Sequence, residues 1–339
     1  MHKTALLGKT PDELKALAVE EGMPAFTGNQ IAEWIYKAKI QTISEMSNIS
    51  LKNRALLEEK YEIGKYAPGM RQASIDGTVK YLFKTIAGHF IESVFIPEDD
   101  RATLCISSQV GCKMNCLFCM TGKQGFAANL TAGEILNQFF SIPESDQLTN
   151  IVFMGMGEPL DNLKEVLRTL EIMTASYGPA WSPKRITVST IGLLSGLKVF
   201  LNESECHLAV SMHSPFAEER LKLMPVQKPC PIDKVLEEVK KHDFSRQRRV
   251  SFEYIMFDGL NDTMRHAVEM VKLLRGVDCR VNLIRFHAIP GVDLKTSPEQ
   301  KMIDFRDYLT NKGVLTTIRK SRGEDIFAAC GMLSSSKRS

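Results

Sequence analysis

Residues 102–119 read ATLCISSQVGCKMNCLFC, and they decide the predicted fold. Ala102–Ser107 is predicted to be a strand, and the loop after it carries Cys112, Cys116 and Cys119 in a C-x3-C-x2-C pattern. Reactive side chains directly after a strand are typical of barrels built from parallel strands, whose functional groups collect at the carboxyl ends of the strands.

The same arrangement recurs along the chain. Six further strands are predicted, with helical stretches between them: Asn150–Met154, Arg185–Thr190, His207–Met212, Val250–Met256, Arg280–Phe286 and Val314–Lys320. Gly155-Met156-Gly157-Glu158 follows the first of these, and Cys330 lies beyond the last. The alternation predicts an α/β fold, with a parallel sheet closed or partly closed as a TIM-type barrel.

A different pattern precedes the barrel. Residues 1–65 read as a helical accessory domain, in which Thr10-Pro11-Asp12-Glu13 is a capping box with proline at the first helical position. Two more helices are predicted at Asn29–Lys37 and Leu51–Tyr61. Residues 66–97 read as an antiparallel meander leading into the barrel of residues 98–333, and 334–339 as a polar tail. Two further capping boxes, at Thr131–Glu134 and Ser297–Gln300, are predicted to open barrel helices.

Composition narrows the class of protein. The net charge of +3 over 339 residues does not by itself indicate a nucleic-acid binder, and no apolar run approaches the length of a membrane span. With no signal-peptide core at the N-terminus, we expect a cytoplasmic protein whose thiols stay reduced. Four of the eight cysteines fall within fifteen residues, which favours metal binding or thiol chemistry over a disulfide scaffold.

The clustered cysteines favour an iron–sulfur site. Three thiolates can bind three irons of a [4Fe–4S] cube and leave the fourth iron open to S-adenosylmethionine (SAM). The alternative is zinc, which normally takes four closed ligands, and no fourth Cys or His lies at finger spacing.

With an aromatic residue, Phe118, before the third cysteine, this motif resembles the radical SAM superfamily, and Met154–Pro159 is similar to its second motif. More narrowly, the chain resembles the RlmN family of adenine-C2 methyltransferases and its relative Cfr, which methylates C8. Four segments carry this narrower resemblance: Cys105–Cys112, Phe153–Pro159, Met212–Pro215 and Asp325–Gly331.

The resemblance implies methylation of an adenosine in 23S rRNA, at the peptidyl-transferase centre, and of the adenosine 3′ of the anticodon in tRNA. It implies that Cys330 carries the methyl group as S-methylcysteine, that Cys105 resolves the RNA adduct by a transient disulfide, and that Glu92 accepts the ring proton. The resemblance also implies two SAM molecules per turnover, because one supplies the methyl group and the other the radical. Flavodoxin or ferredoxin would supply electrons, and a monomer would suffice.

The SAM contacts that the resemblance implies are Gly157, Glu158, Ser189, Ser211, Met212, His213 and His287. The family commonly has Asn where this chain has His287, so a core histidine is an alternative there. Cys105 could be a buried small hydrophobe, and Glu92 could lie on the solvent face of its strand. Cys206, Cys230 and Cys279 match no motif and are interpreted as structural.

Basic clusters at Lys240–His242, Arg246–Arg249 and Arg319–Arg322 suit RNA phosphates, although charge runs are often only solvated surface. Three alternative functions remain: a C8 methyltransferase of the Cfr type, a radical SAM enzyme acting on a peptide or protein, and a non-enzymatic metal-containing RNA-binding protein. The last would not cleave SAM, and the second would not need Cys105 and Cys330.

Overall fold

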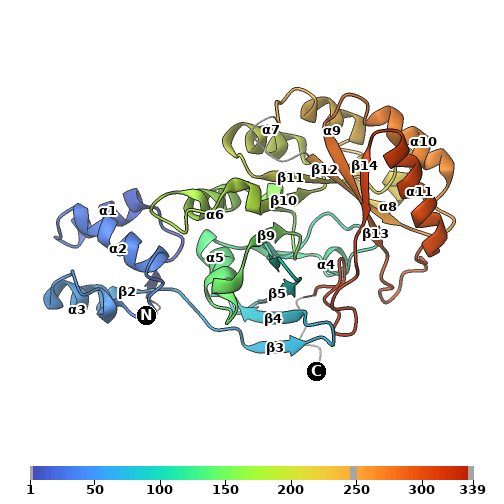
Figure 1. Ribbon diagram of the computed structural model, residues 1–339. Coiled ribbons are helices and arrows are strands. Elements are labelled where there is room, and N and C mark those ends of the chain that lie inside the picture. Colours follow the sequence, from blue (N-terminus) through green and yellow to red (C-terminus); the bar gives the residue numbers. More distant parts are fainter. Residues whose placement is uncertain (1–2, 245–249, 335–339) are drawn as a thin grey trace.

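The computed structural model describes residues 3–244 and 250–334 (Figure 1). Its centre is a ten-stranded sheet in the order β14-β13-β12-β11-β10-β9-β6-β5-β4-β3. The barrel strands are β6 (Ala102–Cys105), β9 (Asn150–Phe153), β10 (Ile186–Thr190), β11 (His207–Ser211), β12 (Val250–Met256), β13 (Cys279–Arg285) and β14 (Leu315–Ile318). All neighbouring pairs from β6 to β14 are parallel, and β14 does not pair with β6, so the predicted partial barrel is confirmed.

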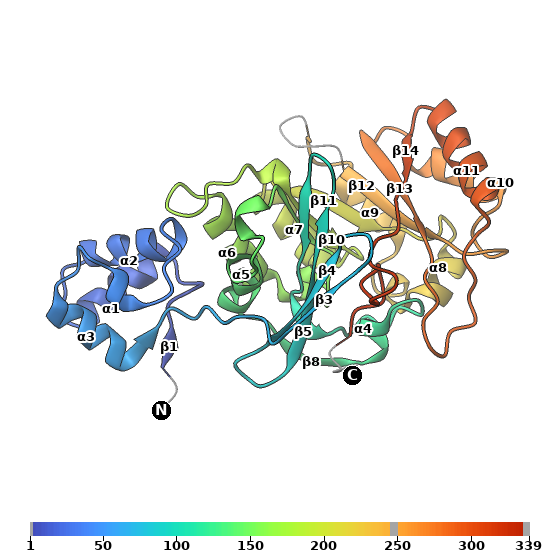
Figure 2. The same cartoon turned by 60° about the horizontal axis from the view of Figure 1, so that its bottom comes forward.

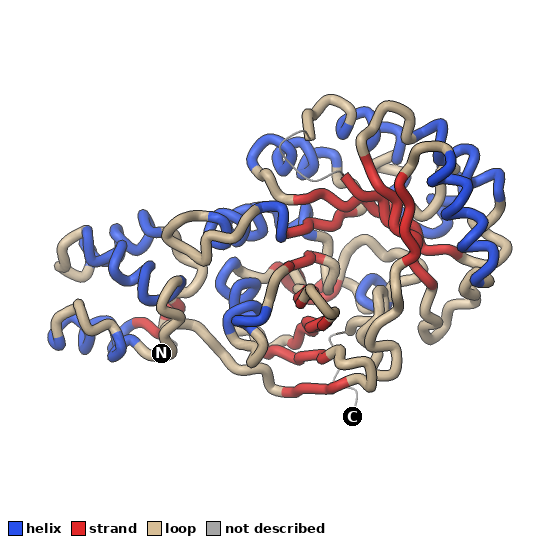
Figure 3. The backbone as a smooth tube through the Cα atoms, viewed as in Figure 1, coloured by secondary structure: helices blue, strands red, loops and turns tan. Residues whose placement is uncertain are grey.

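Helices cover the outer face of this curved sheet (Figure 3). They are α5 (Ala132–Phe140), α6 (Leu163–Thr174), α7 (Leu194–Glu203), α8 (Ala217–Leu223), α9 (Ile232–Val239), α10 (Met264–Leu273) and α11 (Glu299–Asn311). The capping box at Thr131 is confirmed. The one at Ser297 is wrong: α11 begins after Pro298 without a side-chain cap, and Ser297 Oγ instead donates to Asp262 Oδ2 at 2.8 Å.

The predicted meander is confirmed as three antiparallel strands that extend the sheet beyond β6. They are β3 (Met70–Ala73), β4 (Val79–Lys84) and β5 (Phe90–Pro97), and β5 pairs with β6. In the turned view of Figure 2 these strands lie beside the last part of the chain. A further hairpin, β7 (Gln109–Gly111) with β8 (Phe126–Asn129), encloses the cysteine loop and the short helix α4 (Met120–Lys123).

The N-terminal segment forms a separate layer to one side of the sheet (Figure 1). It contains α1 (Pro11–Glu20), α2 (Phe26–Tyr36) and α3 (Leu51–Lys60), with β1 (Thr4–Ala5) paired to β2 (Tyr61–Glu62). The capping box of α1 is confirmed, and its Thr10 side chain accepts from Glu13 N.

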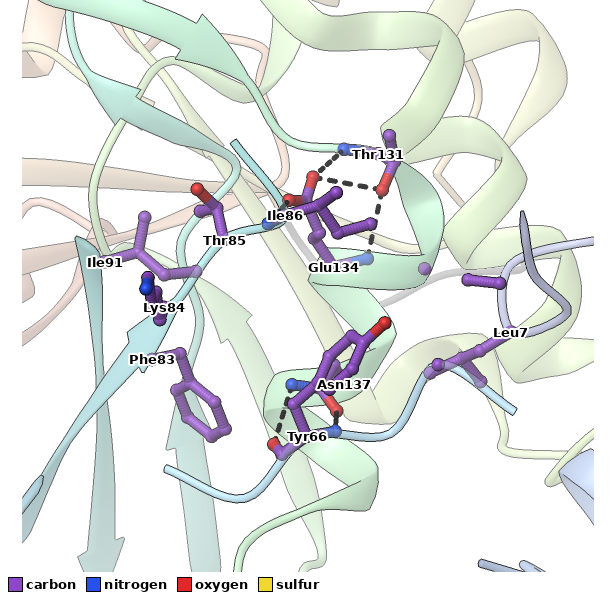
Figure 4. Close-up of a pocket in the computed structure, with 13 residues that line it drawn as sticks. Leu7, Tyr66, Phe83, Lys84, Thr85, Ile86, Ile91, Thr131, Glu134 and Asn137 are labelled. Atoms are coloured by element: carbon purple, nitrogen blue, oxygen red, sulfur yellow. Dashed lines mark hydrogen bonds between the residues drawn. The ribbon is translucent and has the colours of Figure 1, made fainter. Parts of the chain in front are cut away.

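A small, mostly apolar pocket lies where the N-terminal layer meets β4, β5 and α5 (Figure 4). There the Asn137 side chain exchanges two hydrogen bonds with the backbone of Tyr66, at 2.8 and 3.0 Å. Glu134 accepts from Ile86 N at 3.0 Å. In the described part of the chain, no helix is both long and apolar enough to cross a bilayer.

Candidate active site

One cavity at the carboxyl ends of the strands brings together most of the predicted site residues. It encloses about 1090 Å³ of space, part of it open to solvent, which suits a ligand of nucleotide size. The predicted residues that line it are Cys105, Cys112, Cys116, Cys119, Gly157, Glu158, Ser189, Ser211, His213 and Cys330. Glu92, Met212 and His287 are not part of its lining.

The cysteine loop is held by the hairpin around it. Cys112 N donates to Gly125 O at 2.9 Å, where Gly111 has a φ of +75°. A Cβ on Gly111 would lie 1.9 Å from the Gly125 carbonyl oxygen, so only glycine allows this approach. Phe118 packs edge-on against His213, with ring centroids 4.8 Å apart. The loop therefore presents its three thiols from a fixed backbone.

The donor set fits a cluster better than a single ion. Within the described residues, no three His, Cys, Asp or Glu side chains gather closely enough to hold one metal ion. A [4Fe–4S] cube binds each thiolate through a different iron, so its ligands need not converge on one point. Cys112 and Cys116 are buried, and burial raises the pKa of the Cys112 thiol to about 12. Thiolates at these positions therefore need a positive partner.

Arg220 supplies positive charge next to this loop. The residue is fully buried, and its guanidinium donates to the carbonyl oxygens of Ile191, Ser211 and Met212 at 3.0–3.1 Å. It also donates to Gln227 Oε1 at 2.6 Å, and no carboxylate among the described residues pairs with it. A buried cation whose hydrogen-bond partners are neutral oxygens suits an anionic cluster held by thiolates.

Glu158 is aimed into the same cavity from the turn after β9. Its carboxylate accepts from Thr190 Oγ1 at 2.5 Å, from Ile191 N at 3.0 Å and from Leu160 N at 3.1 Å. Burial is the largest influence on the pKa of Glu158 and raises it to about 7. Gly157, with a φ of +101°, lets the turn approach Gln109, whose Cβ would be 2.6 Å from an added Cβ. The carboxylate can accept from an ammonium group in the cavity.

The end of β11 contributes a neutral imidazole. His213 has a φ of +56°, and its Nδ1 accepts from Ile255 N at 3.0 Å. Burial lowers its pKa to about 3, so the ring stays neutral at physiological pH. Met212 is fully buried next to it. His287 is buried between Ser321 Oγ and Glu324 Oε1, each 3.3 Å from a ring nitrogen, which is the surrounding expected for a core histidine.

Cys105 and Cys330 face the cavity from opposite ends of the barrel sequence. Cys105, on β6, is buried, and burial raises its thiol pKa to about 12. Cys330 is exposed and lies in a loop pinned to α4, where Met120 N donates to Gly331 O and Thr121 Oγ1 donates to Leu333 O, both at 2.8 Å. No disulfide joins the two thiols in this structure.

Glu92 lies on the cavity face of the sheet, because directly paired residues and residues two apart on a strand share a face. Val94 pairs with both Cys105 and Lys80, and Glu92 is two residues from Val94. The interpretation of Glu92 as solvent-facing is wrong: it is 5% exposed, with Lys80 Nζ 3.1 Å from Oε1. Ser334 N donates to its Oε2 at 2.8 Å, so the end of the described chain covers it.

Sequence reasoning missed several residues of this region. Glu253 lines the cavity from β12, where its Oε1 accepts from Asn282 Nδ2 at 2.7 Å. The sequence does contain a sign of this residue, because Glu253 is the only charged residue in the otherwise largely apolar strand VSFEYIM. Thr190, Lys80 and Arg220 act through contacts distant in sequence, which no local pattern reveals. Of the basic clusters, Arg319–Arg322 leads into the Cys330 loop, and Arg246–Arg249 lies outside the described residues.

Comparison with known proteins agrees with this geometry. Residues 106–274 match the radical SAM superfamily, and residues 4–63 match the N-terminal domain of ribosomal RNA large subunit methyltransferases. A probable dual-specificity RNA methyltransferase RlmN of Parabacteroides distasonis is 66% identical over 99% of this chain and 98% of its own length. The RlmN enzyme of Desulfotalea psychrophila is 39% identical over 98% and 95%. The crystal structure of a radical SAM methyltransferase from Sphaerobacter thermophilus superposes with a TM-score of 0.92 and 35% identity, covering 98% of this chain and all of that one.

Proposed function

Because this chain belongs to the RlmN family of radical SAM RNA methyltransferases, we propose that it methylates C2 of adenosine in 23S rRNA and in tRNA. The observation that carries the proposal is the pair Cys105 and Cys330, which line the same cavity as the three-thiol loop. C2 of adenine is electron-poor and does not attack SAM directly, so a methyl group has to reach it by way of the protein.

Cys112, Cys116 and Cys119 hold the [4Fe–4S] cluster in this proposal, and the cluster with SAM supplies a 5′-deoxyadenosyl radical when both are bound. Arg220 offsets the negative charge of the thiolates. Glu158 accepts from the methionine ammonium group of SAM, while Gly157, Ser189 and the Ser211–His213 segment complete its pocket. His287 lies outside the cavity lining, so a direct SAM contact from it needs a local rearrangement.

Cys330 is the thiol that accepts the methyl group, as S-methylcysteine. A thiolate is the nucleophile in such a displacement, and a thiol with a pKa near 12 is almost entirely protonated at neutral pH. Desolvation raises the pKa of the Cys330 thiol as well, so the preference for Cys330 over Cys105 in this proposal rests on the exposure of Cys330 to the cavity and to solvent. The second SAM is then used to remove a hydrogen atom from the methyl group, which gives two SAM molecules per turnover.

Cys105 resolves the covalent adduct between protein and RNA by attacking the Cys330 sulfur, so that the disulfide forms as the bond between that sulfur and the transferred carbon breaks. The carbon stays on C2, where a proton completes the methyl group, and the one unpaired electron passes back to the electron-transfer partner. Glu92 takes the C2 proton, and for this the Ser334 N–H has to leave its carboxylate, because the described tail covers it. An electron donor such as flavodoxin or ferredoxin supplies the electron for the radical step, and a dithiol reductant returns the disulfide to two thiols with two electrons and two protons. One chain contributes all of these groups, so the enzyme acts as a monomer.

RNA reaches the cavity beside Arg319, Lys320 and Arg322, which suit phosphate groups. C2 of a base in folded RNA is not accessible, so the target adenosine is extruded into the cavity.

The test is nucleoside mass spectrometry after the reconstituted enzyme, SAM and dithionite act on unmodified rRNA and tRNA. We expect 2-methyladenosine from both, and none from Cys330→Ala, while Cys206→Ala, a buried cysteine outside the cavity, behaves as the wild type. Formation of 8-methyladenosine would refute C2 selectivity. Cleavage of SAM with no methylated adenosine in any RNA would refute the RNA substrate.

A further inference from the structure

The Cys330 loop is tied at its beginning to the turn between β3 and β4. Asp325 accepts from Ser74 Oγ at 2.6 Å and from Ile75 N at 3.2 Å, and Gly323 N donates to Asp76 Oδ2 at 3.0 Å. Ala328 N closes a tight turn on Gly323 O at 2.8 Å. Two segments about 250 residues apart therefore form one small unit beside the cavity.

This unit presents two apolar side chains to solvent. Ile75, at the tip of the β3–β4 turn, is 98% exposed, and Phe327, between Asp325 and Cys330, is 45% exposed. Phe327 has a φ of +53°, a left-handed conformation that bulky residues rarely adopt. Strained residues of this kind persist where the surroundings fix them, and they concentrate at functional sites.

The charge around Phe327 favours a polyanion as its partner. Arg319, Lys320 and Arg322 precede it with exposed or half-exposed side chains. Arg319 lies 3.7 Å from Glu253 Oε2, while Glu324 contacts His287 and Asp325 holds the turn, so Lys320 and Arg322 are the basic side chains here without an ion pair among the described residues. An aromatic face flanked by basic residues is the usual platform for an unpaired base, because every base has a π face and its phosphate needs a cation.

We propose that Phe327 stacks on the RNA base next to the methylated adenosine, and that Ile75, in the turn hydrogen-bonded to the same loop, adds apolar surface. This inference rests on the proposed function. Extruding the adenosine into the cavity removes the stacking partner of its neighbour, and Phe327 directly precedes Ala328, the first residue of this loop that lines the cavity. An aromatic face there replaces the lost partner and holds the RNA open.

The test uses an RNA stem-loop that carries the target adenosine in its loop and 2-aminopurine at the next nucleotide, whose fluorescence is quenched by stacking. We expect the Phe327→Ala variant to bind the probe about ten-fold more weakly than wild type and to leave it brighter in the complex. Phe327→Trp should restore both, and Ile75→Ser should weaken binding by a smaller factor. Val268→Ala, an exposed apolar change on α10, is the control and should match wild type.

Methylation of Cys330 by SAM, followed by peptide mass, reports on the loop itself and should be unchanged in Phe327→Ala. Loss of that methylation would overturn the inference, because Phe327 would then serve loop packing. Wild-type affinity and quenching in Phe327→Ala would overturn it as well. A wild-type enzyme that methylates no RNA refutes the proposed function instead, so the two failures are distinguishable.

Discussion

Replacing Lys80 with methionine is expected to destabilise the protein by about 3–5 kcal/mol, because it leaves a buried carboxylate without its cation. The side chains of Lys80 and Glu92 are 8% and 7% exposed, and their charged atoms are 3.1 Å apart. Methionine keeps a long unbranched stem, so loss of packing contributes little. Ser334 N–H, which donates to Glu92 Oε2 at 2.8 Å, is a neutral backbone donor and does not replace a full positive charge.

The assay is denaturant unfolding of the full-length chain, monitored by circular dichroism. The double variant Lys80→Met with Glu92→Gln should recover a large part of the loss, because the amide carries no charge to bury. Lys272→Met is the matched control, since Lys272 pairs with Glu269 at 2.9 Å on the surface, with a side chain 61% exposed. That change should cost no more than about 0.5 kcal/mol. An equally small effect of Lys80→Met would refute the reasoning that this pair is desolvated.

Three further changes test the site. Gly111→Ala should lower the iron bound per chain after reconstitution, because its Cβ would meet Gly125 O, whereas Gly88→Ala, with a similar φ and open space around it, should not. Arg220→Met should lower the free energy of unfolding by about 3–5 kcal/mol, since it leaves several buried oxygens without donors; a change below about 1 kcal/mol would contradict this. His213 has a pKa lowered from 6.5 to about 3, so the unfolded chain gains a proton on acidification that the folded chain does not. Stability should therefore fall by about 1.4 kcal/mol per unit as pH drops from 6 to 4, and this slope should flatten in His213→Asn.

The barrel could be predicted from sequence because each strand is an apolar run followed by a chemically distinctive turn. All seven predicted barrel strands are confirmed within a few residues, for example β9 at Asn150–Phe153 against the predicted Asn150–Met154. The error at Ser297 has a tertiary cause, since its hydroxyl donates to Asp262, which lies 35 residues earlier in another loop. A capping sequence shows that a side chain is able to cap a helix, but the cap forms only where no tertiary partner binds that side chain instead.

The residues of the candidate site also fall into two groups, those that the sequence predicts and those that it does not. The cysteine loop and Glu158 lie within contiguous motifs, so their joint position in the cavity followed from strand order alone. The pairing of Lys80 with Glu92 depends on β4–β5 register, and Arg220 reaches from α8 to the ends of two strands, β10 and β11. Such contacts are fixed by packing, and the sequence carries no periodic pattern for them.

The attachment of the Cys330 loop to α4 links two events that are otherwise separate. Met120 and Thr121, which hold Gly331 and Leu333, directly follow Cys119. A displacement of Cys119 would therefore also displace the backbone on the C-terminal side of Cys330, through these two hydrogen bonds. In the function proposed above, the loop that would hold the cluster and the thiol that would carry the methyl group are therefore fixed to each other, so neither can change position alone.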